Sequence, residues 1–152
     1  MGGSIIRVLV VDDYEPWHGF VSATLRCHAD IQIAGRVFDG LEAVQRAQQL
    51  QPNLILMDIG LPTLNGIEAA RRIRETSPTS KILFVSANHS PDIAEEALST
   101  GAGGYLAKSD AGSELLAAVK AILEGKRFIS ASLASHFLVA TTVGALPTVL
   151  LP

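Results

Sequence analysis

Residues 5–13 read IIRVLVVDD, a short apolar run that ends in two adjacent aspartates. Such a run, with a single charge inside it, is typical of a strand that is buried on both faces of a parallel sheet. Four later runs have the same character, and each follows turn or polar residues. They are Ile31–Val37, Leu54–Met57, Lys81–Val85 and Gly104–Ala107. We therefore expect five strands.

Helical stretches separate these strands and follow the last one. They are Pro16–Arg26, Leu41–Leu50, Gly66–Glu75, Pro91–Thr100 and Ser113–Glu124. Start and stop signals mark several ends, as where Ser90 precedes Pro91 as an N-cap and Gly125 follows the last helix. Parallel strands need crossover connections, so this alternation predicts a doubly wound parallel α/β sheet with helices on both faces.

The composition is that of a folded, mildly acidic chain. Its 152 residues predict one domain with at most a short appendage. Hydrophobic residues make up 48% and charged residues 18%, which is enough for a core and too little charge for a disordered chain. The net charge of −3 disfavours a broad basic surface for nucleic acid. We expect no direct nucleic-acid contact.

Cysteine usage and the first residues bear on localisation. Cys27 is the single cysteine, so we expect neither an intramolecular disulfide nor a cysteine-rich zinc site. Residues 1–4 run directly into the first apolar strand without the charged and long apolar regions of a signal peptide. Together these features predict a cytoplasmic protein.

Polar side chains that could bind a ligand or take part in a reaction lie at the carboxyl ends of the expected strands. Asp12 and Asp13 follow the first strand and Asp58 the third, while Ser86 and Lys108 follow the fourth and fifth. Singly, such an acid is usually a loop or cap residue. Ligands of open α/β sheets bind at this edge, however, and three carboxylates brought together there repel one another unless one protonates or a cation joins them. Hard oxygen ligands of this kind suit Mg²⁺.

The motifs at these strand ends resemble, in order and spacing, the receiver domain of two-component response regulators from Ile5 to about Arg127. They are Asp12-Asp13, Asp58-Ile59-Gly60-Leu61-Pro62 with Asn65-Gly66, Ser86-Ala87, and Tyr105-Leu106-Ala107-Lys108. The stretch Leu61–Arg74 is most like receivers that precede a helix-turn-helix in DNA-binding regulators. The resemblance implies a flavodoxin-like fold with five strands in the order 2-1-3-4-5.

The resemblance implies that Asp58 is the phosphoacceptor. Its carboxylate would attack a phosphohistidine on a sensor histidine kinase or a histidine phosphotransfer protein. The side chains of Asp12, Asp13 and Asp58 and the backbone carbonyl of Gly60 would hold Mg²⁺ or Mn²⁺, with Asp12 acting mainly through water. The implied protein is not an enzyme beyond catalysing its own phosphorylation and dephosphorylation.

Phosphoryl binding and switching are also implied by the resemblance. Lys108, the Ser86 hydroxyl and the Ala87 backbone would bind the phosphoryl oxygens. The added charge would draw Ser86 inward, and Tyr105 would rotate from solvent into the space left behind. The face of the fourth helix, fifth strand and fifth helix would then bind a downstream effector or a second copy as a homodimer. Gly60 stands where many members carry a larger shielding side chain, which leaves the phosphoryl lifetime open.

Residues 128–152 form an apolar extension after an expected receiver domain at 1–127. The extension is too short and too poor in charge for a helix-turn-helix, so we expect no output domain. One interpretation is a frayed remnant of a lost output domain. Another is that its apolar side chains dock on a partner or a second copy. Membrane attachment ranks third and is not expected.

Two alternatives to a phosphorylatable receiver remain open from the sequence. One is an unphosphorylated docking or dimerisation module of the same fold. The other is a phosphatase with an aspartyl nucleophile, but Asp12-Asp13 lacks the intervening residue of the D-x-D pattern used by such enzymes. The complete set of three acids, a hydroxyl and a lysine favours the receiver.

Overall fold

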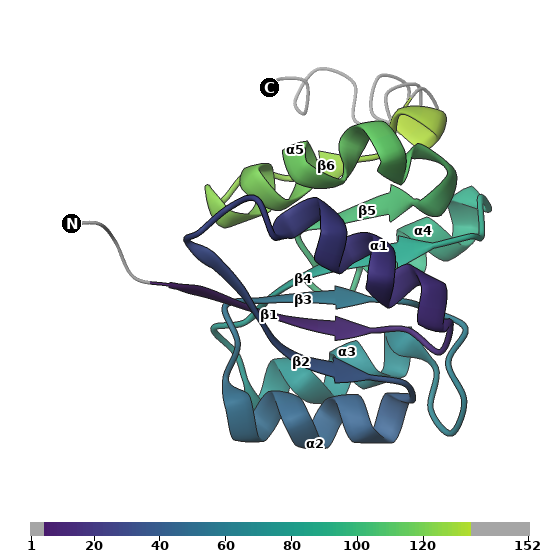
Figure 1. The fold of residues 1–152 in the computed structure, drawn as a ribbon. Coiled ribbons are helices and arrows are strands. Elements are labelled where there is room, and N and C mark those ends of the chain that lie inside the picture. The colour runs from purple at the N-terminus through teal and green to yellow at the C-terminus, as the bar shows by residue number, and fades with distance from the viewer. Residues whose placement is uncertain (1–4, 135–152) are drawn as a thin grey trace.

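The structure is a computed structural model that describes residues 5–134. Its centre is one parallel sheet (Figure 1) with the strand order β2-β1-β3-β4-β5-β6. The strands are β1 (Ile6–Val11), β2 (Ile31–Val37), β3 (Leu54–Met57), β4 (Lys81–Ser86), β5 (Gly104–Ala107) and β6 (Phe128–Ile129). The chain adds β2 on one side of β1 and β3 on the other. The order therefore reverses between β1 and β3, where α/β sheets place their ligand crevice.

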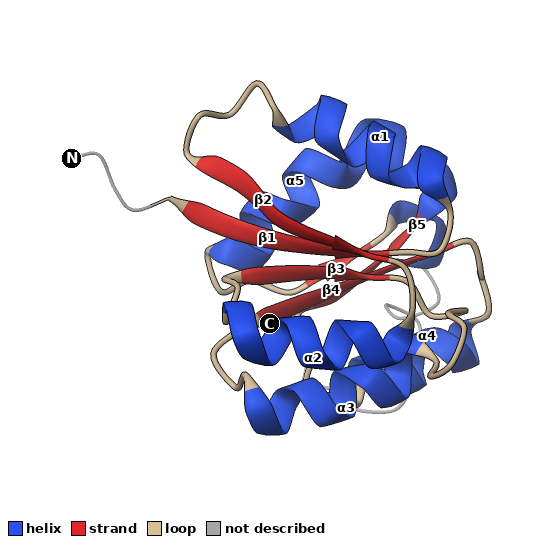
Figure 2. Ribbon diagram, turned by 60° about the horizontal axis from the view of Figure 1, so that its bottom comes forward, coloured by secondary structure: helices blue, strands red, loops and turns tan. Residues whose placement is uncertain are grey.

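Within residues 5–134, five helices cover the two faces of the sheet. They are α1 (Glu15–Leu25), α2 (Gly40–Leu50), α3 (Gly66–Thr76), α4 (Pro91–Leu98) and α5 (Ala111–Leu123), with a 3₁₀ turn at Lys108–Asp110. Figures 1 and 2 show α1 and α5 on one face and α2, α3 and α4 on the other. Side-chain caps begin α2 and α3, because Asp39 and Asn65 accept hydrogen bonds from backbone amides one turn later.

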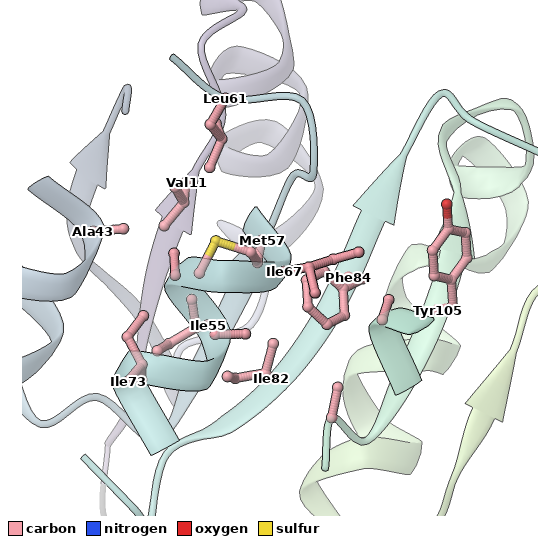
Figure 3. Close-up of a cluster of buried hydrophobic side chains, with 14 of the residues drawn as sticks. Val11, Ala43, Ile55, Met57, Leu61, Ile67, Ile73, Ile82, Phe84 and Tyr105 are labelled. Carbon is pink, nitrogen blue, oxygen red and sulfur yellow. The ribbon is translucent and has the colours of Figure 1, made fainter. Parts of the chain in front are cut away.

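Alternation along the strands builds one core on each face. In β1, Val8 and Val10 pack with α1 and α5, whereas Leu9 and Val11 pack with α2, α3 and α4. Because successive side chains of a strand point to opposite faces, a continuous apolar run supplies both cores. Figure 3 shows the second of these cores, in which strand and α3 side chains interlock. The rigid sheet fixes where its strand ends lie.

The predicted fold class is confirmed, with one addition. The five expected strands and helices are present, and the order 2-1-3-4-5 holds, but a sixth strand, β6, pairs in parallel with β5. This strand falls in the segment that the sequence assigned to the extension. It pairs with the edge of β5, whose backbone groups would otherwise lack partners. Its length is too short for any hydrophobic period to show in the sequence.

The chain that follows β6 is tied to the start of α5. The Ser130 hydroxyl donates to the carboxylates of Asp110 and Glu114, and the Ser132 amide donates to Asp110 at 3.0 Å. The hydrogen bonds from Ser130 and Ser132 hold the pKa of Asp110 below its ordinary value. Leu133 is 3% exposed and belongs to the core beside α4. Residues 128–134 are therefore part of the packed fold.

The rest of the predicted extension, residues 135–152, lies outside the described residues. Within residues 5–134, the helices are too short or too polar to cross a membrane.

Candidate functional site

Three carboxylates meet at the carboxyl ends of β1 and β3. Asp12 and Asp13 directly follow β1, and Asp58 directly follows β3. One oxygen of each carboxylate lies within 4.8 Å of the others. Asp12 is fully buried and Asp58 is 9% exposed, whereas Asp13 faces solvent. The predicted convergence of the three acids is confirmed.

A close backbone approach fixes the loop after Asp58. The Ile59 amide donates to Asp58 Oδ1 at 2.8 Å, and the amide of Gly66, the first residue of α3, donates to the Ile59 carbonyl at 2.8 Å. A Cβ atom at Gly66 would lie 1.9 Å from the carbonyl oxygen of Asp58. Because Gly66 has no side chain, the start of α3 can pack directly against the backbone of Asp58 and Ile59.

Burial raises the pKa of Asp58 from 3.8 to about 6, with the negative charges of Asp12 and, to a smaller extent, Asp13 acting in the same direction. The Lys108 ammonium and the Ile59 amide act against this rise without cancelling it. A divalent cation among the three acids would oppose this rise, because its charge offsets the repulsion between the carboxylates. Three carboxylates with one open to solvent also fit Mg²⁺, which binds few protein oxygens and keeps several waters.

Lys108 reaches the acids from the end of β5. Its Nζ lies 2.7 Å from Asp12 Oδ2, and its side chain is 20% exposed. The ammonium also lies 5.1 Å from the ring centroid of Trp17 and 5.9 Å from that of Tyr14. Cation–π attraction at these distances adds to the ion pair. The positive charge is thus held beside the carboxylates.

A cavity of about 470 Å³ opens over Asp58. Its lining consists of Asp58, Ile59, Gly60, Ser86, Ala87, Asn88 and Lys108. The structure therefore brings together every residue predicted to bind the phosphoryl group. A Cβ atom at Gly60 would find nothing within 4 Å, so the cavity is open on that side.

Tyr105 differs from the expectation. The sequence-based hypothesis placed its ring in solvent before switching, but the side chain has 0% exposure. Its hydroxyl donates to the Asn88 carbonyl at 2.9 Å, and the Asn88 amide donates to the Ser86 hydroxyl at 3.0 Å. Figure 3 shows the ring in the core near Phe84. The prediction that the Tyr105 ring faces solvent is therefore wrong for this conformation, because the space beside β4 accommodates the ring.

The same environment acts on the ionisation of Tyr105. Burial raises the pKa of its hydroxyl, and the charge of Asp58 acts in the same direction, against a hydrogen bond with Ser86. The neutral hydroxyl is therefore the stable form and remains a donor to Asn88.

Sequence reasoning missed two neighbours of the acids on α1. The predicted site included neither of them. His18 is 1% exposed, and its Nε2 lies 2.8 Å from the Asp12 carbonyl oxygen. Trp17 packs beside Phe20, and its ring centroid lies 5.1 Å from the Lys108 ammonium. The only signal was their place in the first turn of the helix after Asp12-Asp13.

The comparisons with known proteins identify the family. The profile of the response regulator receiver domain matches residues 8–120. The chain belongs to this family. This receiver is 31% identical over 132 residues to response regulator GacA of Pseudomonas viridiflava. The aligned region covers 87% of this chain and 62% of GacA. It is 32% identical over 124 residues to transcriptional regulatory protein DegU of Brevibacillus brevis, covering 82% of this chain and 52% of DegU. The receiver therefore spans less than two thirds of these relatives.

Solved structures support the same assignment. A LuxR-family two-component response regulator from an Aurantimonas species superposes with a TM-score of 0.85 at 29% identity, covering 91% of this chain and 99% of that one. The response regulator domain of Thermotoga maritima CheB gives a TM-score of 0.72 at 32% identity, covering 79% and 97%. The predicted membership of the two-component response regulators is thus confirmed.

Proposed function

We propose that this receiver is phosphorylated on Asp58 in a Mg²⁺-dependent reaction and transmits a signal through protein contacts. The observation that carries the proposal is the meeting of three carboxylates within 4.8 Å beside a cavity that Lys108 and Ser86 line. Family membership supplies the class of donor, a phosphohistidine on a sensor histidine kinase or a histidine phosphotransfer protein. The relatives are longer than this chain, and the proposal concerns only the site that the receiver itself contains.

The chemistry needs a carboxylate that is ionised and aligned. An Asp58 oxygen forms a bond to phosphorus as the P–N bond of the donor breaks, and the imidazole nitrogen keeps the electron pair. Asp12, Asp13, Asp58 and the Gly60 carbonyl would hold Mg²⁺, or Mn²⁺, which neutralises charge on the approaching anionic groups. The Asp58 side chain is oriented by the Ile59 amide, so one of its oxygens is already engaged.

The remaining cavity residues would stabilise the transferred phosphoryl group. The Lys108 ammonium would shift from Asp12 toward a phosphoryl oxygen. The movement is small, because Lys108 already lines the cavity over Asp58. The Ser86 hydroxyl would donate to a second oxygen and the Ala87 backbone amide to a third. These donors surround the position where negative charge accumulates. The resulting protein catalyses its own phosphorylation and dephosphorylation and is not otherwise an enzyme.

The switch would operate through the contacts of Ser86 and Tyr105. The Ser86 hydroxyl accepts from the Asn88 amide and keeps its own hydrogen free to donate to a phosphoryl oxygen. An inward movement of Ser86 would therefore act on the Asn88 loop that Tyr105 also contacts. Because Tyr105 is already buried, phosphorylation would stabilise this arrangement rather than create it. The α4-β5-α5 face would then bind an effector or a second copy in the cytoplasm.

The proposal is tested by intact mass after incubation with acetyl phosphate. We expect wild type with Mg²⁺ to gain one phosphoryl group, and wild type without Mg²⁺ or Asp58→Asn to gain none. Asp92→Asn removes an exposed acid from α4 and serves as the matched control that is still labelled. Equal labelling of Asp58→Asn would refute the assignment of the acceptor. Failure of folded wild type to be labelled, by acetyl phosphate or by any phosphorylated histidine donor, would favour the docking module.

A further inference from the structure

A second cavity lies at the opposite edge of the sheet from Asp58. It has a volume of about 560 Å³ and is bounded by the end of α3, the start of β4, the loop before β5 and the end of α5. In Figure 1 the strand arrows point away from this edge. A volume of this size is within the range of small-molecule sites. It shares no lining residue with the phosphorylation cavity.

Four cationic side chains from three parts of the chain line this cavity, namely Arg74, Lys81, Lys126 and Arg127. They are a third of the 12 Lys and Arg residues, although the protein has a net charge of −3. The described residues that line the cavity include no Asp or Glu. The cavity is therefore a local concentration of positive charge on an acidic protein.

Most of this charge lacks an internal partner. Within residues 5–134, no carboxylate lies within ion-pair distance of Arg74, Lys81 or Arg127, and Lys126 pairs only with the exposed Glu124 at 3.2 Å. The sequence of residues 135–152 contains no Asp or Glu. Cations are favourable near helix C-termini, which accounts for Arg74 in the last turn of α3 and for Lys126 and Arg127 just after α5. Lys81 is the first residue of β4, so no helix C-terminus accounts for its positive charge there.

The wall of the cavity positions Arg74. Gly101 has a φ of +94°, and a Cβ atom there would lie 3.2 Å from the Arg74 Nε and 3.4 Å from one of its terminal nitrogens. The guanidinium thus rests against backbone that carries no side chain. Gly103 similarly leaves room beside Ile122, where a Cβ atom would lie 2.8 Å from the Ile122 Cδ1. Small residues keep the cavity open next to a held arginine.

We propose that this cavity binds a small molecule that carries two or more linked phosphate groups. Arginine presents paired donors that match phosphate oxygens, and lysine adds point charges that follow a chain of phosphates. Among residues 5–134 the lining has no aromatic side chain on which a ring would stack, so the phosphates would supply most of the recognition. The site is separate from Asp58 and does not depend on the proposed phosphorylation.

Calorimetric titration with inorganic tripolyphosphate, in buffer without Mg²⁺, tests the proposal on the full chain. We expect saturable 1:1 binding that Arg74→Gln/Arg127→Gln weakens at least about tenfold, since two charge-assisted contacts are lost. The matched control is Arg26→Gln/Lys120→Gln, which removes the same charge from exposed positions outside the cavity. The control should bind as wild type does, and so should Asp58→Asn.

Amide NMR shifts locate the bound phosphates. Shifts confined to Gly101, Gly103 and Gly125 support the site, whereas shifts centred on Ser86 and Lys108 assign the anion to the phosphorylation cavity and overturn it. Absence of saturable binding, or equal weakening in both double variants, also overturns it. Binding of hexaglutamate as tight as that of tripolyphosphate replaces the phosphate ligand with an acidic peptide and refutes the proposal as stated.

Discussion

The two edges of the sheet carry opposite charge and relate to the fold in different ways. At the carboxyl edge, Asp12 and Asp58 are buried against the core and are linked to backbone amides and to Lys108. At the amino edge, Lys81 and Arg127 are exposed and contact no carboxylate among the described residues. Charge at the first edge is thus coupled to folding, while charge at the second is nearly independent of it. Substitutions at the two edges should differ in size accordingly.

The largest effect is expected from Gly66→Ala beneath the acidic edge. The added methyl group would lie 1.9 Å from the Asp58 carbonyl oxygen, so α3 or the loop must move. We expect the free energy of unfolding in urea to fall by about 3 kcal/mol or more, as in severe overpacking. Gly112→Ala in α5 is the control, because a Cβ atom there meets nothing within 4 Å. Similar stabilities for the two variants would show that the approach of α3 is not required.

A pH-dependent effect of nearly the same size is expected from Asp58→Asn. Because the pKa of Asp58 rises from 3.8 to about 6, its ionisation costs the folded state up to about 3 kcal/mol at neutral pH. The folded state binds the proton more tightly, so this cost is absent below about pH 4, grows between pH 4 and 6 and is complete above. Without Mg²⁺, Asp58→Asn should therefore unfold at higher urea than wild type at pH 7.5 and equally at pH 3.5.

The Mg²⁺ control separates charge from packing in that comparison. Saturating Mg²⁺ should stabilise wild type at pH 7.5, since the cation compensates the carboxylates, and should stabilise Asp58→Asn less. A gain for Asp58→Asn that does not change with pH would contradict the electrostatic origin.

A smaller loss is expected from Tyr105→Phe, which removes the hydrogen bond to the Asn88 carbonyl. The lost bond should lower the unfolding free energy by about 1 kcal/mol. Tyr14→Phe is a matched control because Tyr14 is 60% exposed and should change little. If both variants matched wild type in urea unfolding, the Tyr105 hydroxyl would not hold the ring in place.

The smallest effects are expected at the basic edge. Lys81→Gln removes an exposed charge, and Lys126→Gln breaks a pair whose side chains are 72% and 61% exposed. Each should change the unfolding free energy by less than about 0.5 kcal/mol. Urea unfolding at low and high salt measures both. A loss above about 1 kcal/mol from either substitution would mean that this charge supports the fold and would remove the contrast between the two edges.

The sequence alone determined the five main strands and helices and the acids at the strand ends. Apolar runs such as Ile6–Val11 are local signals, because a strand buried on both faces needs apolar residues throughout. Asp12, Asp13 and Asp58 were predictable as a group because parallel strands end at the same edge of a sheet.

Only the tertiary structure decided what depends on packing between distant segments. The two-residue β6 exists because β5 offers an edge, and Tyr105 is buried because space beside β4 admits its ring. The cations of the second cavity come from segments with no common motif, so their proximity follows from how α3, β4 and α5 end at one edge. A local apolar pattern indicates which face of a strand or helix must be buried. Contacts between distant segments produce no such periodic signal in the sequence.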